Sequence, residues 1–145
     1  TTCPLTNQCS AARSMLAALA DARIEPAKVS YVSAHGTGTK TNDRLETLAM
    51  LRAFGSAARR IPTSSIKSML GHTMGAASAF ESIACVLAVA QDAVPPTTNF
   101  RQPDPECDLD YVPNEARQLR VDVALNNAAA FGGNNASVVF RKVAA

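Results

Sequence analysis

The sequence has no tryptophan, and aromatic residues make up only 5% of its 145 residues. Small aliphatic side chains must therefore fill the core, as happens where helices pack closely on a sheet. The longest apolar run, Ile83 to Ala90, is too short to span a bilayer. The N-terminus has no basic segment followed by an apolar stretch, so no signal peptide is expected. We therefore expect a globular chain with no membrane partner.

An excess of one charge sign is also missing, because 14 basic residues oppose 12 acidic ones. The basic residues are scattered and form no stripe interleaved with aromatics, which argues against nucleic-acid binding. The cysteines form no CxxC pair and no zinc-finger spacing; they are Cys3, Cys9, Cys85 and Cys107. A metal site would have to combine His35, His72 and a cysteine without any short ligand spacing. We therefore expect no metal, no cofactor and a reducing cytoplasmic environment.

The apolar fraction of 47% and the charged fraction of 18% fit one globular domain with its own core. Helical patterns alternate with strand-like ones along the chain. Helices are expected over residues 10–22, 42–54 and 73–91, and strands over 29–34, 61–66, 121–125 and 136–140. This order predicts a layered α/β fold, with helices on a mixed sheet that an antiparallel hairpin closes.

Three helix starts follow from capping chemistry. Ser10 is expected to cap the first helix, and Thr73 the last. Asp43 is expected to cap the middle helix, which places Glu46 at the third helical position of a capping box. The helix over 73–91 has almost no polar stripe, so we expect it to be buried on more than one side.

His35 lies at the end of the expected strand over 29–34 and is followed by Gly36 and Gly38. Ligand clefts of α/β proteins form at the C-terminal ends of strands, and glycines let a substrate approach the backbone. A neutral imidazole there can donate its N–H to a carbonyl or enolate oxygen. Thr37 and Thr39 add hydroxyl donors. A histidine packed into a tight turn is the alternative interpretation.

His72 directly precedes the last expected helix. The positive end of the helix dipole disfavours imidazolium there and should lower the pKa of His72. Lys67 lies five positions earlier, where its ammonium could anchor a carboxylate or hold Glu46. Glu46 and Asp43 could orient Lys67 or a histidine, or simply cap their helix. An exposed lysine and a helix-start histidine without a catalytic role are the plain alternatives.

Three motifs in the same order resemble those of β-ketoacyl-acyl-carrier-protein synthases, including polyketide ketosynthases. They are AHGTGT at 34–39, KSMLGH at 67–72 and FGGNN at 131–135. The segment VPPT at 94–97 also matches the family, so the similarity runs from about residue 10 to Phe140. The resemblance implies a thiolase-like fold, of which residues 1–145 form the C-terminal half, and a decarboxylative Claisen condensation in fatty acid or polyketide biosynthesis.

The resemblance also implies residue roles. His35 and His72 would bind the thioester carbonyl of the malonyl unit and stabilise the enolate. Lys67 would support the histidine pair, with Glu46 as its possible intermediary. Thr37 and Thr39 would contact the pantetheine arm. Phe131, with Gly132 beside it in the glycine turn, would gate access to the acyl pocket.

The family's nucleophilic cysteine has no counterpart here, because no cysteine of the chain matches its motif. The chain therefore resembles only the C-terminal half of such an acyltransferase and would need an N-terminal half to supply the cysteine. The other implied partner is an acyl carrier protein with phosphopantetheine-linked acyl or malonyl groups. Residues 128–130 are alanines where many relatives carry a Phe-Gly-Phe run ending at Phe131, which changes the expected gate.

Two interpretations of the whole chain are weighed. The first is part of a condensing enzyme, and the second is a non-catalytic scaffold or chain-length-factor-like subunit of a polyketide synthase. Intact histidine motifs favour the first, because a non-catalytic relative is expected to lose them. Since the helix over 73–91 would be poorly covered in this chain alone, a homo- or hetero-oligomer is expected.

Overall fold

The computed structural model describes residues 7–143. The α-helices are α1 (Asn7–Asp21), α2 (Lys40–Phe54), α3 (Lys67–Leu70) and α4 (Ala77–Gln91). The strands are β1 (Tyr31–Ser33), β2 (Thr63–Ser64), β3 (Ala93–Val94), β4 (Arg117–Gln118), β5 (Val123–Ala130) and β6 (Asn134–Arg141). Short 3-10 turns span Pro26–Lys28, Gly55–Arg60, Met74–Ala76 and Phe131–Gly133.

The main sheet is mixed, with the strand order β2-β1-β5-β6. β1 pairs in parallel with both β2 and β5, whereas β5 and β6 form a long antiparallel hairpin. The Phe131–Gly133 turn joins this hairpin, with Gly132 at φ 81°. The expected layered α/β fold with a mixed sheet and a closing hairpin is confirmed.

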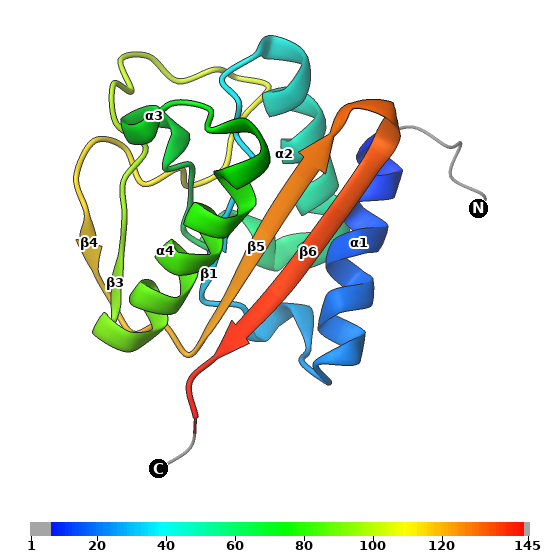
Figure 1. The fold of residues 1–145 in the computed structure, drawn as a ribbon, viewed down its shortest axis with the longest axis vertical. Coiled ribbons are helices and arrows are strands. Elements are labelled where there is room, and N and C mark those ends of the chain that lie inside the picture. Colours follow the sequence, from blue (N-terminus) through cyan, green and yellow to red (C-terminus); the bar gives the residue numbers. More distant parts are fainter. Residues whose placement is uncertain (1–6, 144–145) are drawn as a thin grey trace.

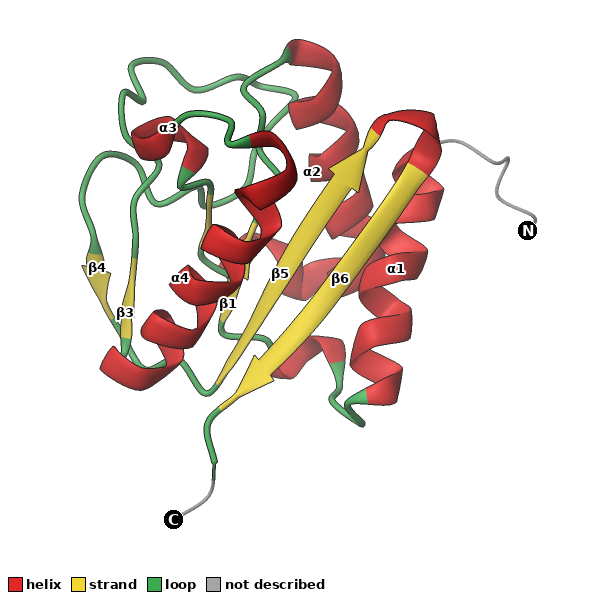
Figure 2. Cartoon of the chain, in the orientation of Figure 1, coloured by secondary structure: helices red, strands yellow, loops and turns green. Residues whose placement is uncertain are grey.

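The sheet lies between two helical layers (Figures 1 and 2). On one face, Met15 and Leu19 of α1 and Met50 of α2 form a core with Val32 and Leu125 of the sheet. On the other face, Cys85, Ala88 and Val89 of α4 pack against Tyr31 and Ala124. The alternation of neighbours such as Tyr31 and Val32 between the two faces follows from the period of two along a strand.

The helix starts differ from those expected. α1 begins at Asn7, so Ser10 lies inside the helix and does not cap it; residues 1–6 lie outside the described part. α2 is capped by Thr39, whose Oγ1 accepts the N–H of Asn42 at 3.3 Å. Asp43 therefore falls in the first turn, where it accepts the N–H of Gly38.

α4 also begins later than expected. Thr73 precedes a 3-10 turn over Met74–Ala76 without a side-chain capping bond, and the α-helix starts at Ala77. The short helix α3, which starts at Lys67, is not among the helices expected from the sequence. A further element missing from the sequence-based expectation is the small antiparallel pair β3-β4, whose two-residue strands are too short to leave a pattern.

One face of α4 packs on the sheet and the other is exposed, so in this chain alone the helix is buried on one side only, as the expected poor coverage implied. The exposed α4 face consists of Phe80, Ile83, Val86 and Leu87, which are 45–56% exposed. The 18 residues Met74–Gln91 have a mean hydropathy of 1.4, and by length and composition they could cross a membrane. A core helix passes the same test, and Glu81 of α4 is ion-paired and buried against the rest of the chain.

Candidate functional site

Strand β1 delivers His35 to the C-terminal edge of the sheet, as expected, and the ring is largely buried, with 9% of the residue exposed. The chain turns immediately afterwards at Gly36, which has φ +43°. A Cβ on Gly36 would lie 2.4 Å from Cβ of Ser65, and the Ser65 hydroxyl donates to the Gly36 carbonyl at 2.9 Å. Glycine is thus required where the His35 loop meets the end of β2.

The carboxylate of Glu46 holds this loop through its backbone. Its Oε1 accepts the N–H of His35 at 2.8 Å, and its Oε2 accepts the N–H of Gly36 at 2.9 Å. The side-chain amides of Asn127 and Asn42 donate to the same carboxylate at 2.7 and 3.3 Å. Glu46 therefore acts as neither the back-bonding member of a capping box nor the partner of Lys67, and both expectations are corrected.

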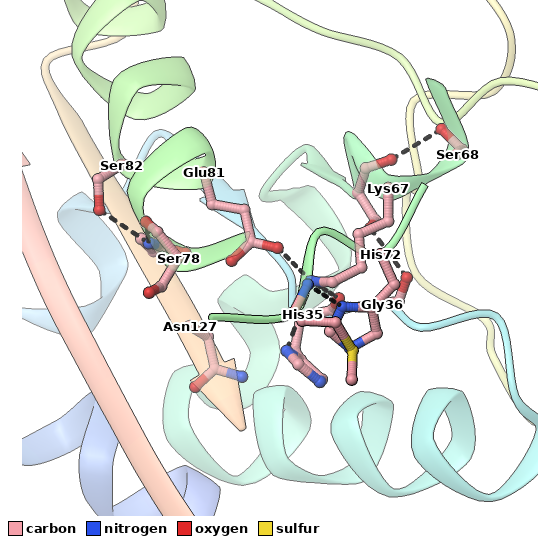
Figure 3. Close-up of polar contacts among 12 residues, drawn as sticks. His35, Gly36, Lys67, Ser68, His72, Ser78, Glu81, Ser82 and Asn127 are labelled. Carbon is pink, nitrogen blue, oxygen red and sulfur yellow. Dashed lines mark hydrogen bonds and ion pairs between the residues drawn. The ribbon is translucent and has the colours of Figure 1, made fainter. Parts of the chain in front are cut away.

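The partner of Lys67 is Glu81, from the buried face of α4. The two side chains form an ion pair with only 6% and 1% of their surfaces exposed. The same ammonium donates to the carbonyl of His35 and lies 3.5 Å from His35 Nδ1 (Figure 3). Burial raises the pKa of Glu81, and the bond from Lys67 opposes that rise. Lys67 thus links α4 to the histidine at the end of β1.

His72 follows α3, two residues after its last residue Leu70. Its Nδ1 accepts the backbone N–H of Met74 at 3.1 Å. Met74 has φ 52°, a left-handed conformation that costs a non-glycine residue roughly 1–2 kcal/mol. This local strain accompanies a fixed orientation of the His72 ring.

The two imidazoles meet, as expected, with ring centroids 5.8 Å apart and planes at 84°. In each ring Nδ1 faces a donor, so we assign the proton of the neutral form to Nε2. Burial is the main cause that lowers the pKa of His35 to about 4, and the neighbouring Lys67 and His72 make smaller contributions in the same direction. Within the described chain, neither Nε2 has a hydrogen-bond partner. Each ring can therefore donate its Nε2–H to a bound oxygen.

A cavity of about 680 Å³ contains both rings. The other expected site residues in its wall are Thr37, Thr39, Phe131, Gly132 and Glu46. Thr37 and Thr39 hydrogen-bond each other through their hydroxyls at 3.2 Å, and the Phe131 side chain is fully exposed. A second cavity, of about 690 Å³, lies beyond a wall formed by Thr37, Glu46 and His72, and Asp43 and Lys67 line it. The fold thus gathers all the expected site residues around two adjoining cavities.

Two residues of the site were not identified from the sequence. Glu81 carries a carboxylate on an otherwise apolar helix face, and that isolated charge was the available signal. Asn127 is 1% exposed within β5, and a buried amide in the middle of a strand was likewise a signal. Neither signal indicates which residue each side chain contacts. Glu81 contacts Lys67, which is 14 residues away, and Asn127 contacts Glu46, which is 81 residues away.

Among the described residues, no group of three or more histidine, cysteine, aspartate or glutamate side chains could hold a metal ion. Three buried oxygens lack a hydrogen-bond partner there: Ser33 Oγ, Glu81 Oε2 and Asn126 Oδ1. Ser33 and Asn126 are neighbours across β1 and β5. Such oxygens are acceptors for a buried water or ligands for a hard cation.

Comparison with known proteins accounts for this arrangement. The family model "Beta-ketoacyl synthase, C-terminal domain" matches residues 1–101. The chain is 56% identical over 129 residues to nodulation protein E of Rhizobium sp. (strain N33), covering 89% of this chain and 32% of that protein. It is 49% identical to 3-oxoacyl-[acyl-carrier-protein] synthase 2 of Synechocystis sp., covering 97% of this chain and 34% of the other.

Solved structures agree. A β-ketoacyl synthase from Burkholderia phymatum superposes with a TM-score of 0.88 at 40% identity, covering 94% of this chain and 33% of that one. A ketosynthase solved with its type II polyketide synthase acyl-carrier protein gives 0.92 at 41% identity, covering 99% and 35%. The chain spans about a third of the length of the curated relatives it matches. It has the thiolase-like architecture of these enzymes and belongs to the β-ketoacyl synthase family, whose C-terminal domain it carries.

Proposed function

We propose that this chain supplies His35, His72 and Lys67 to a β-ketoacyl-acyl-carrier-protein synthase. The reaction is the decarboxylative Claisen condensation of a malonyl thioester with an acyl thioester. The observation that carries the proposal is the pair of imidazoles in one cavity, with ring centroids 5.8 Å apart. Two N–H donors aimed at one oxygen provide the electrostatic stabilisation that an enolate needs.

The malonyl carboxylate leaves as carbon dioxide, and the electrons of the broken C–C bond form an enolate. Its oxygen accepts hydrogen bonds from Nε2–H of both histidines, so no proton has to move. The enolate carbon then attacks the acyl carbonyl held on a cysteine, and the cysteine thiolate leaves. Burial keeps His35 neutral, and the Lys67 ammonium beside Nδ1 adds to this effect because it disfavours a second positive charge and orients the ring.

Thr37 and Thr39 contact the pantetheine arm in this proposal, because their hydroxyls line the histidine cavity. Phe131, with Gly132 beside it, controls access to the acyl group. Its ring is fully exposed and sits on a turn that contains two glycines at positive φ. Glu46 and Asp43 support the His35 loop through its backbone N–H groups.

The nucleophilic cysteine comes from an N-terminal ketosynthase segment in this proposal. Cys85 and Cys107 are free thiols, but burial raises the pKa of each, which opposes thiolate formation. The exposed α4 face offers an apolar surface for that segment. An acyl carrier protein delivers the substrates in the cytoplasm, whose reducing conditions suit free thiols.

The test uses the complete protein that contains this chain, with malonyl-acyl-carrier protein as substrate. His35→Ala and His72→Ala should each slow decarboxylation by about 10²–10³, the usual loss for one oxyanion donor. Acylation of the cysteine should persist, because it needs neither enolate donor. Lys28→Ala, at an exposed site on another part of the chain, is the control.

Unchanged decarboxylation in both histidine variants would contradict the proposed roles. A wild-type protein that binds the carrier but never decarboxylates malonyl thioesters would instead indicate the scaffold or chain-length-factor-like role. One structural relative is described as a ketosynthase/chain length factor. The intact histidine pair favours the catalytic role over that alternative.

A further inference from the structure

Asn127 is a buried amide in strand β5 that joins two parts of the structure. Its Nδ2 donates to Glu46 Oε1 at 2.7 Å, and its Oδ1 accepts from the Ser137 hydroxyl of β6 at 3.2 Å. The orientation of the amide is fixed, because a carboxylate accepts hydrogen bonds but cannot donate them. Ser137 is in turn bonded to Ser14 of α1 at 3.0 Å. The hairpin and α1 are thereby connected to the Glu46 carboxylate.

The carboxylate of Glu46 is the only link in this chain of contacts that reaches the backbone of His35. Its Oε1 receives two donors, the His35 N–H and the Asn127 amide, at 2.8 and 2.7 Å. The Asn127 side chain therefore holds Glu46 Oε1 in position, and this oxygen in turn holds the backbone of His35. Figure 3 shows Asn127 on the β5 side of the group that contains His35 and His72.

We propose that Asn127 is a positioning residue for the enolate-stabilising site, acting through Glu46 on the His35 loop. The inference rests on the proposed function for its activity readout. Asn127 also lines the histidine cavity, but its side-chain donor is used by Glu46 and its acceptor by Ser137. Its contribution is therefore the placement of His35, and the essential property is a donor at Nδ2.

The substitution Asn127→Asp tests this property, because it keeps the shape and replaces the donor with a second carboxylate. Two carboxylates at hydrogen-bond distance cannot both remain ionised without strong repulsion. At low pH the pair shares a proton, and the resulting O–H donates to its partner as the amide did. At high pH both carboxyl groups ionise and repel each other. Glu46 then moves away from the backbone N–H groups of the His35 loop, and the loop is no longer held in place.

Other titratable groups face this position and must be matched between variants. Asp43, Glu81 and Tyr111 act electrostatically on or from Glu46, and His35 and His72 share the cavity. From α1 and β6, Ser14 and Ser137 are the contacting groups, and neither titrates in the working range. All of these groups are present in both wild type and variant. The pH dependence of the ratio of the two activities therefore reports the titration of the new carboxyl group alone.

The measurement is malonyl-acyl-carrier-protein decarboxylation by the complete protein across about pH 5 to 8, as the ratio of variant to wild-type kcat. For Asn127→Asp the ratio should fall by about 10–100-fold from the acid to the alkaline end, the size typical of lost supporting contacts. For Asn127→Ala the ratio should be low at every pH. KM for the carrier substrate should change little in both, because the contact positions the histidine and not the arm.

Two controls separate positioning from general effects. Gln118→Glu adds one carboxylate at an exposed amide of β4, and its ratio should stay flat. Glu46→Gln combined with Asn127→Asp leaves a single carboxylate, so the pH dependence of the ratio should disappear. Folding is followed by thermal unfolding, and an Asn127→Asp protein folded at pH 6 but not at pH 8 would also support the repulsion.

A flat Asn127→Asp ratio in a folded protein would overturn the proposal, as would normal kcat in Asn127→Ala. If Asn127→Asp fails to fold at every pH, the kcat of Asn127→Ala decides. Failure of the proposed function looks different, since the wild-type protein would then lack decarboxylation or ignore the loss of His35 and His72.

Discussion

His35 is the residue whose surroundings most change its chemistry. Burial comes first among the causes that lower its pKa from 6.5 to about 4. The neighbouring ammonium of Lys67 adds to this effect, and Asp43 opposes it. At neutral pH the ring is therefore uncharged, which is the state that can donate one N–H without losing a proton.

The lowered pKa of His35 predicts a loss of stability in acid. Between about pH 6.5 and 4, the unfolded chain binds a proton at this position and the folded chain does not. Stability therefore falls as pH decreases through this window, by at most about 1.4 kcal/mol per pH unit for one group. Urea unfolding of the complete protein at several pH values measures the slope.

The variant His35→Gln should show a shallower slope over the same window, because glutamine does not titrate. Equal slopes for wild type and His35→Gln would show that the ring is not held neutral by the fold.

Gly36 is the second residue at which a single atom decides the site. Gly36→Ala should lower the free energy of unfolding by about 2–4 kcal/mol, because a positive φ and an overpacked contact with Ser65 both oppose the new Cβ. Gly38→Ala is the matched control, since Gly38 also has positive φ but open space around it, and should cost only about 1–2 kcal/mol. Chemical denaturation compares the two, and equal losses would mean that the Ser65 contact is unimportant.

Helix α4 is the element that carries two different chemistries on opposite faces. Its sheet-facing side contains Glu81 and Cys85, and its other side is the exposed α4 face. The ion pair with Lys67 ties the position of the helix to the His35 loop. Breaking a buried pair on one side leaves an uncompensated charge, so α4 and α3 must be placed together.

The exposed α4 face predicts the effect of a new charge. In the complete protein Ile83→Glu should lower the free energy of unfolding by about 3–5 kcal/mol, because a partner segment would bury the carboxylate without a counter-charge. Leu16→Glu, at a half-exposed position of α1 in the other helical layer, should change it by no more than about 0.5 kcal/mol. Urea unfolding measures both variants.

In the isolated chain the α4 face is exposed, so Ile83→Glu should have a favourable effect there. It should reduce self-association of the chain, which sedimentation or light scattering measures. A complete protein that tolerates Ile83→Glu as well as Leu16→Glu would contradict the covered face.

At the scale of the whole molecule, the three-layer arrangement brings four separate segments to one edge. The end of β1 carries His35, the segment after α3 carries His72, α2 carries Glu46, and the β5–β6 turn carries Phe131. Parallel pairing of β1 with β2 and β5 sets their C-terminal ends at the same edge, which is where ligands bind in α/β sheets. The histidine cavity opens there.

The sequence predicted the layered α/β class and the closing hairpin, because these depend on local periodicity. It also predicted that His35, His72 and Lys67 belong to one site, because short motifs contain them. It misplaced the helix starts at Ser10, Asp43 and Thr73, since several neighbouring hydroxyl and carboxyl side chains could each act as a cap. It also missed β3 and β4, which are too short for a periodic signal.

The sequence by itself thus determined which residues are available for the site, namely two histidines, a lysine and glycine-rich turns. Only the tertiary structure decided how they are paired. Lys67 takes Glu81 as its partner, and Glu46 takes the backbone of His35 and the amide of Asn127, because packing of α4 and β5 brings distant residues to hydrogen-bond distance. Sequence separation carries no information about such contacts, whereas burial makes each of them obligatory.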